Sequence, residues 1–170
     1  MLDKECSLRY MKYDDLITVL KWRNSNHVRL NMKDDHIISP EEHRNWFNGL
    51  DTKKNHYLIF LYEGVPSGLL YFNHVNMTHK HCTWGFYLGN RQMPKGTGAK
   101  MGALGLEHAF EHLGVRKVCA EVFSFNVKSL RFHERLGFIK EGVLKEHYLK
   151  NNTYEDIVCY ARFNKRSANS

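Results

Sequence analysis

A glycine-containing segment, Pro94-Lys95-Gly96-Thr97-Gly98-Ala99, stands between a predicted strand and the longest predicted helix of this chain. The strand spans residues 82–88, and the helix spans residues 99–113 with apolar residues at helical spacing. Glycines in such a loop let backbone N–H groups approach an anion, with the positive end of the helix dipole behind them. A phosphate-binding turn is therefore one interpretation. A simple turn is the other, because the loop lacks the spacing of a P-loop or a dinucleotide fingerprint.

Predicted strands and helices surround this loop in an order that indicates the α/β (α+β) class. Ser39-Pro40-Glu41-Glu42 combines an N-cap serine, a proline at the first helical position and a capping-box glutamate, so a helix begins there. Residues 63–68 predict a hairpin connection, and Asn151-Asn152 predicts a tight turn. The predicted strands span residues 8–11, 57–62, 69–75, 82–88, 117–123, 138–149 and 154–163, and the helices begin at Asp14 and Ser39 or span residues 99–113 and 126–136.

No repeat or linker divides the chain, so residues 1–164 are expected to form a single domain, followed by a basic tail at residues 165–170. Neither a signal peptide nor a run of about 18 apolar residues is present, so we expect a cytoplasmic protein without membrane contact. The four cysteines stand far apart, which indicates reduced thiols and argues against a metal site. The formal charge of +7 favours anionic partners, but the short basic runs disfavour nucleic acid.

Two polar residues interrupt apolar helix stripes. Arg23 follows the series Leu16, Val19 and Leu20, where it is either a snorkelling side chain or an anion-binding group. His43 lies in line with Trp46, Phe47 and Leu50, where it either packs or acts in a site.

The second diagnostic block runs from Asn126 to Phe138 and contains Ser129, His133, Glu134, Arg135, Leu136 and Gly137 at fixed spacing. Together with the glycine loop, it resembles the GNAT N-acetyltransferase superfamily. The resemblance implies a mixed, mostly antiparallel seven-stranded sheet with about four helices, and an enzyme that acetylates a primary amine with acetyl-CoA. It further implies that coenzyme A contacts Leu88, Gly96, Thr97, Gly98, Ala99, Lys100, Met101, Asn126, Ser129 and Phe132.

This chain departs from the superfamily pattern at two positions. Met93 stands where Gln or Arg is usual, which leaves phosphate binding intact if the donors are backbone amides. His133 stands where a tyrosine often protonates the leaving thiolate. A histidine can do so if it is protonated near neutral pH, and otherwise it only packs.

Within the superfamily, the chain is most similar to the N-acetyltransferases of the pseudaminic acid pathway, which acetylate the 4-amino group of a UDP-linked 4-amino-4,6-dideoxy sugar. The similarity runs through Trp22-Arg23-Asn24, Met32, His43 and His79-Lys80-His81. It implies a nucleotide-sugar substrate bound by Arg23, Met32, His43, Trp46, Thr83 and Tyr87, although Thr83 stands where an aromatic residue is expected.

The expected mechanism is direct attack of the amine on the thioester. The resemblance implies that backbone amides near Tyr87 and Leu88 stabilise the oxyanion, while Glu121 accepts the amine proton through a water and His133 protonates the thiolate. Two alternatives stay open: a ribosomal-protein N-terminal or spermidine acetyltransferase of the same fold, and a non-catalytic module that binds nucleic acid or a regulator. A polyamine pocket should be lined by carboxylates. The sequence also leaves open whether the chain forms a homodimer.

Overall fold

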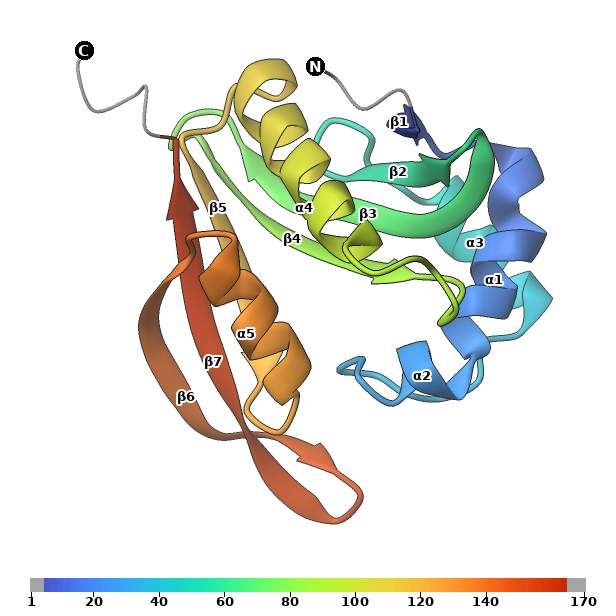
Figure 1. Cartoon of the computed structure of the whole chain (residues 1–170). Coiled ribbons are helices and arrows are strands. Elements are labelled where there is room, and N and C mark those ends of the chain that lie inside the picture. Colours follow the sequence, from blue (N-terminus) through green and yellow to red (C-terminus); the bar gives the residue numbers. More distant parts are fainter. Residues whose placement is uncertain (1–4, 165–170) are drawn as a thin grey trace.

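The computed structural model describes residues 5–164, so the predicted basic tail at residues 165–170 lies outside the described part of the chain. It contains one seven-stranded sheet in the order β1-β2-β3-β4-β5-β7-β6 (Figure 1). The β4–β5 pair is parallel and every other neighbouring pair is antiparallel, which confirms the predicted mixed sheet. The strands are β1 (Cys6–Tyr10), β2 (His56–Tyr62), β3 (Val65–Asn76), β4 (His81–Leu88), β5 (Lys117–Phe123), β6 (Ile139–Lys150) and β7 (Thr153–Phe163).

The helices are α1 (Leu16–Asn24), α2 (Asn26–Arg29), α3 (Pro40–Asn48), α4 (Thr97–Glu107) and α5 (Val127–Arg135). The predicted capping box starts α3: the Ser39 hydroxyl accepts the Glu42 N–H at 3.1 Å, and the Glu42 carboxylate accepts the Ser39 N–H. The sequence did not indicate α2, because four residues are too few for a periodic pattern. Within residues 5–164, no helix is both long enough and apolar enough to cross a bilayer.

Several predicted boundaries differ from the structure by a few residues. The connection expected at residues 63–68 shrinks to Glu63-Gly64, because both residues adopt positive φ (49° and 77°) and β3 starts at Val65. The helix expected at residues 99–113 starts at Thr97 and changes to a π-helix at His108–His112. The Asn151-Asn152 turn is confirmed, with φ of 49° and 60°.

Helices cover both faces of the sheet. Successive residues of a strand point to opposite faces, so each central strand contributes side chains to both covered faces. Leu70 packs in a core cluster with Met101 of α4, on the face that α4 and α5 cover (Figure 1). Leu69, the preceding residue, belongs to a second cluster with Leu16 and Val19, on the face of α1 and α3. The two faces of the central strands therefore belong to two separate core clusters.

Strands β4 and β5 diverge after a short parallel ladder. Only His81, Cys82 and Thr83 of β4 have partners in β5, and the last pair is Thr83 with Cys119. Beyond this pair the two strands separate, as Figure 1 shows. The C-terminal half of β4 therefore has β3 on one side and an open edge on the other.

Candidate active site

The open edge of β4 presents a backbone amide at Leu88. The Gly89 N–H donates to the Ser67 carbonyl at 2.8 Å, so the antiparallel alternation pairs Tyr87 with Leu69 by hydrogen bonds. Leu88 consequently turns its N–H and C=O away from β3, towards β5. Its carbonyl lies 3.2 Å from Nε2 of His27 in α2. Of the two predicted oxyanion donors, Leu88 has the required direction, whereas the Tyr87 amide faces β3.

The glycine loop forms a tight turn at the start of α4. Gly96 is the N-cap residue with φ of 94°, a conformation that favours glycine. The Thr97 hydroxyl donates to the Pro94 carbonyl at 2.8 Å, and the Thr97 and Lys100 amides donate to Pro94 and Gly96. Within the described chain, the amides of Gly96, Gly98 and Ala99 have no backbone acceptor at this helix start, so they remain for an anion.

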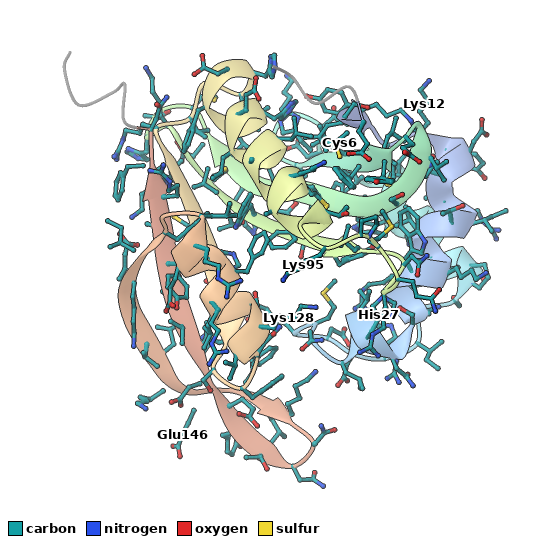
Figure 2. All side chains as sticks on the ribbon, viewed as in Figure 1. Cys6, Lys12, His27, Lys95, Lys128 and Glu146 are labelled. Carbon is teal, nitrogen blue, oxygen red and sulfur yellow. The ribbon has the colours of Figure 1, made fainter. Side chains whose placement is uncertain are left out.

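The side chains of the next two residues have other partners. Lys100 Nζ donates to Glu5 Oε2 at 2.6 Å. Met101 is fully buried in the core, so its side chain is not open to a cofactor, and its predicted part in cofactor binding stays a prediction. Two further lysines lie close to the helix starts. Lys95 immediately precedes Gly96, and Lys128 lies in the first turn of α5 (Figure 2).

Helix α5 packs directly against the glycine loop. Asn126 caps it by accepting the Ser129 N–H at 3.2 Å. A Cβ on Gly98 would lie 3.7 Å from the Phe132 ring and 3.9 Å from Leu88, so these three predicted cofactor residues meet at one place. A Cβ on Gly102 would lie only 2.6 Å from the Leu136 side chain, so any larger residue would force a shift where α4 and α5 approach closely.

His133 lies in the core rather than at an open surface. Its Nε2 accepts the indole N–H of Trp84 at 3.2 Å, and its Nδ1 lies 2.8 Å from the Ser129 carbonyl. Because an indole only donates, the ring proton belongs on Nδ1 and the imidazole is neutral. Burial lowers the pKa of His133, although the bond to Ser129 opposes this shift. The geometry therefore argues against the predicted general acid and favours the packing role.

A cavity of about 340 Å³ lies on the α1–α3 face of the sheet. Five of the six predicted substrate residues line it: Arg23, Met32, His43, Trp46 and Tyr87. The sixth, Thr83, is not part of this lining, and its hydroxyl donates to the Asn73 carbonyl at 3.1 Å. Burial raises the pKa of Tyr87, so this phenol stays neutral.

Three buried polar atoms in the cavity wall have no hydrogen-bond partner within the described chain: Arg23 Nη1, His43 Nε2 and Asn73 Oδ1. Leaving such an atom unpaired costs about 1–3 kcal/mol, so together they indicate a polar ligand. Burial, together with the charge of Arg23, lowers the pKa of His43, although a backbone bond to Leu16 opposes this shift. Sequence reasoning missed Asn73, although it continues the inward series Leu69 and Tyr71 at a spacing of two.

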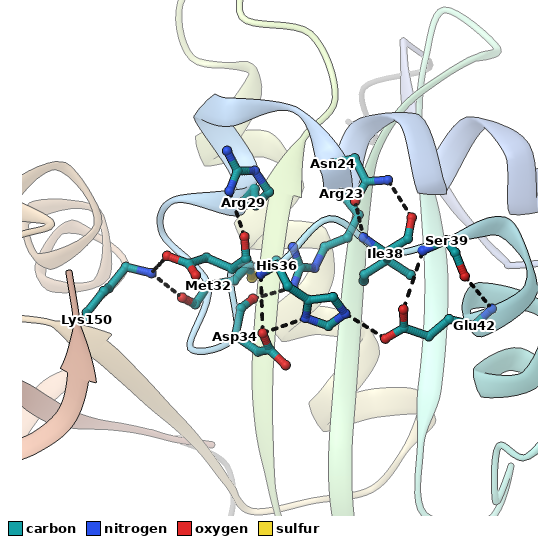
Figure 3. A network of polar contacts seen from close by, with 11 residues as sticks. Arg23, Asn24, Arg29, Met32, Asp34, His36, Ile38, Ser39, Glu42 and Lys150 are labelled. Carbon is teal, nitrogen blue, oxygen red and sulfur yellow. Dashed lines mark hydrogen bonds and ion pairs between the residues drawn. The ribbon is translucent and has the colours of Figure 1, made fainter. Parts of the chain in front are cut away.

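The loop between α2 and α3, residues 30–38, closes one side of the cavity (Figure 3). Asn24 fixes its end through two bonds with the Ile38 backbone, of 2.8 and 2.9 Å. His36 lies between Asp34 and Glu42, 2.7 Å from each carboxylate, and these two bonds raise the pKa of His36. Arg23 Nη2 also donates to the Asp34 carbonyl, at 2.5 Å.

The same loop reaches the other half of the sheet through two lysines. Lys150, whose side chain is only 5% exposed, donates to the Met32 carbonyl and to Asp35, both at 2.8 Å. Lys33 forms an ion pair with Glu121 of β5. Glu121 stands two residues beyond Cys119, the last β5 residue paired with β4. Glu121, the predicted general base, therefore lies where β4 and β5 diverge, and its carboxylate is already paired with the primary ammonium group of Lys33.

Comparison with known proteins gives four results. Residues 8–159 match the model of an acetyltransferase (GNAT) domain. Acetyltransferase PseH of Campylobacter jejuni is 33% identical over 132 residues, which cover 76% of this chain and 80% of that protein. A crystal structure of spermidine N-acetyltransferase from Vibrio cholerae, in complex with CoA and spermine, superposes with a TM-score of 0.90 at 19% identity and covers 98% of this chain and 100% of that one. A prophage-derived N-acetyltransferase of Bacillus subtilis, YokL, is 37% identical over 83 residues, and that match spans about half of its length (47%).

Proposed function

Because this chain belongs to the GNAT acetyltransferase family, and is thus an enzyme that transfers acetyl groups from acetyl-CoA to amines, we propose that its acceptor is a nucleotide sugar. The proposed reaction acetylates the 4-amino group of a UDP-4-amino-4,6-dideoxy-N-acetyl-hexosamine, a step of pseudaminic acid biosynthesis. The similarity to acetyltransferase PseH over 76% of the chain supports this choice.

The described residues fit coenzyme A on the α4–α5 side of the sheet. The amides of Gly98 and Ala99 at the start of α4 suit a pyrophosphate, and the nearby Lys95 and Lys128 add positive charge. Acetyl-CoA, when bound, supplies the acetyl group as a thioester. The outward N–H of Leu88 is the protein donor best directed to stabilise an oxyanion between β4 and β5.

Proton transfer from the amine falls to Glu121 in this proposal. Its carboxylate lies beyond the end of the β4–β5 ladder and is partly exposed, so it can take a proton directly or through water. His133 is neutral and engaged on both ring nitrogens, so the thiolate is protonated by solvent. The Tyr87 phenol lines the acceptor cavity and stays neutral there, where it can serve as a hydrogen-bonding group.

The single observation that carries the acceptor assignment is the buried Nη1 atom of Arg23, which has no hydrogen-bond partner within the described chain. A permanently charged planar donor in a cavity wall suits a phosphate oxygen. His43 Nε2 and Asn73 Oδ1 add two unpaired atoms that suit sugar or base polar atoms, while Met32 and Trp46 supply apolar contacts for a deoxy carbon.

A polyamine acceptor is the second candidate, and two carboxylates favour it. Asp34 and Glu42 both line the cavity, as expected for an ammonium-binding pocket. The fold similarity to the Vibrio cholerae enzyme is compatible with either acceptor, because at 19% identity it supports the fold alone. However, both carboxylates already bind His36, and bonds with His36 lower the pKa of Asp34. Arg23 would moreover repel a polycation.

The Arg23→Gln variant tests the acceptor proposal. Removing a charged hydrogen-bond donor costs about 1.5–3 kcal/mol, so KM for the nucleotide sugar should rise by ~10- to 100-fold while the KM for acetyl-CoA stays unchanged. Arg44→Gln, on the exposed side of α3, is the matched control and should match the wild type. An unchanged acceptor KM in Arg23→Gln, or a lower KM for spermidine without any nucleotide-sugar turnover, would overturn the assignment.

A further inference from the structure

Lys33 holds its primary amine against the carboxylate of Glu121, which is the group proposed to accept the proton from the acceptor amine. The Lys33 ammonium group pairs with Glu121 and lies 5.2 Å from the centre of the Tyr148 ring. Both members of the pair are partly exposed, Lys33 at 46% and Glu121 at 37%. The pair joins two segments 88 residues apart in sequence, so the fold rather than local sequence brings the amine there.

The position of this pair is defined by the strands. Glu121 follows the last β4–β5 partner, Cys119, by two residues and points to the same face. Leu88 directs its N–H into the divergence from the β4 side. Lys33 therefore reaches, from the loop at residues 30–38, the part of β5 that lies just beyond its last pair with β4.

We propose that Lys33 is a self-acetylation site of this enzyme, modified when acetyl-CoA is bound and no acceptor is present. The inference rests on the proposed function only in placing acetyl transfer between Leu88 and Glu121. It does not depend on which acceptor is used.

The chemistry is balanced by groups already in place. The Lys33 ammonium gives one proton to Glu121, and the free Nζ forms a bond to the thioester carbonyl carbon. The carbon–sulfur bond then breaks, the sulfur leaves with its electron pair, and the second proton of the attacking nitrogen reaches the sulfur through water. The products are N-acetyl-lysine and free coenzyme A, and no oxidant or metal is needed.

The charge environment indicates that the reaction is slower than turnover of an acceptor. Burial lowers the pKa of Lys33, but the bond and charge of Glu121 outweigh this and the net pKa is raised. The amine is therefore mostly protonated, and nucleophilic attack needs the transfer to Glu121 first. An acceptor that occupies this carboxylate would displace Lys33 and protect it.

Peptide mass spectrometry of the full-length enzyme, incubated with acetyl-CoA alone, tests the proposal. Lys12, an exposed lysine distant from α5 in Figure 2, reports background chemical acetylation. Because a positioned amine gains effective concentration, Lys33 should be acetylated at least ~10²-fold faster than Lys12. The isosteric Glu121→Gln variant should reduce the Lys33 rate to that of Lys12, with a thermal melt confirming that the variant is folded. Lys33→Arg should abolish the modified peptide.

Equal rates at Lys33 and Lys12, or a Lys33 rate that Glu121→Gln leaves unchanged, would overturn self-acetylation. The two proposals fail separately. Turnover of a nucleotide sugar with Lys33 unmodified refutes only self-acetylation. Rapid Lys33 acetylation without turnover of any offered nucleotide sugar refutes only the acceptor assignment.

Discussion

The indole N–H of Trp84 donates to Nε2 of His133 at 3.2 Å within the core. This contact assigns the ring proton to Nδ1 and keeps the imidazole neutral. His133→Phe should therefore lower kcat by much less than the ~10²-fold loss expected for a general acid, and the pH profile of kcat should keep its shape. The variant should be less stable, because Trp84 loses its acceptor. A ~10²-fold loss of kcat in a folded His133→Phe protein would restore the general-acid role.

Gly102 allows α5 to pack closely against α4, beside the glycine loop. A larger residue at this position should therefore affect both the free energy of unfolding and the binding of the cofactor. In Gly102→Ala the new Cβ would meet Leu136 and Phe132 at 2.6 and 2.8 Å, an overpacking that costs about 1–3 kcal/mol. Urea unfolding should show this loss, and KM for acetyl-CoA should rise because α5 is displaced. Gly142→Ala is the control, since its Cβ would have no neighbour within 4 Å. Similar stabilities of the two variants would contradict the packing account.

Lys150 ties the loop at residues 30–38 to the β6–β7 hairpin. Replacing it with Met removes charged hydrogen bonds to Asp35 and to the Met32 carbonyl, at a cost of about 1.5–3 kcal/mol. The loop should loosen, and hydrogen exchange at residues 32–36 should accelerate. Lys145→Met is the matched control, because Lys145 is 77% exposed and its ion pair with Asp156 is solvated. Unchanged exchange in Lys150→Met would show that the loop does not depend on this anchor.

His108 should make the fold sensitive to acid. Burial, together with the neighbouring His112 and His56, lowers the pKa of His108 to about 4, below the ordinary 6.5. The unfolded chain thus binds a proton at a higher pH than the folded chain. Stability from this group is complete above pH 6.5 and is lost as the pH falls towards 4. Chemical unfolding between pH 7 and 4 should show a smaller decline in His108→Leu than in the wild type, whereas exposed His147→Leu should follow the wild type.

The sequence predicted local features better than contacts across the chain. The Ser39 capping box and the Asn151-Asn152 turn follow from neighbouring residues, so both were confirmed. Arg23 and His43 were detectable because polar groups interrupt apolar stripes. In contrast, the Trp84 partner of His133 is 49 residues away, and Lys33 is 88 residues from Glu121. No periodic pattern encodes such pairings, because they depend on how the strands and loops are placed.

The acceptor is tested most directly by comparing kcat/KM for a UDP-4-amino-4,6-dideoxy sugar, spermidine and a ribosomal-protein peptide, with thiol release as the readout and acetyl-CoA saturating. The unpaired atoms Arg23 Nη1, His43 Nε2 and Asn73 Oδ1 predict that the nucleotide sugar is preferred by at least ~10²-fold over both other amines. Thiol release with spermidine or the peptide alone would contradict the proposed function.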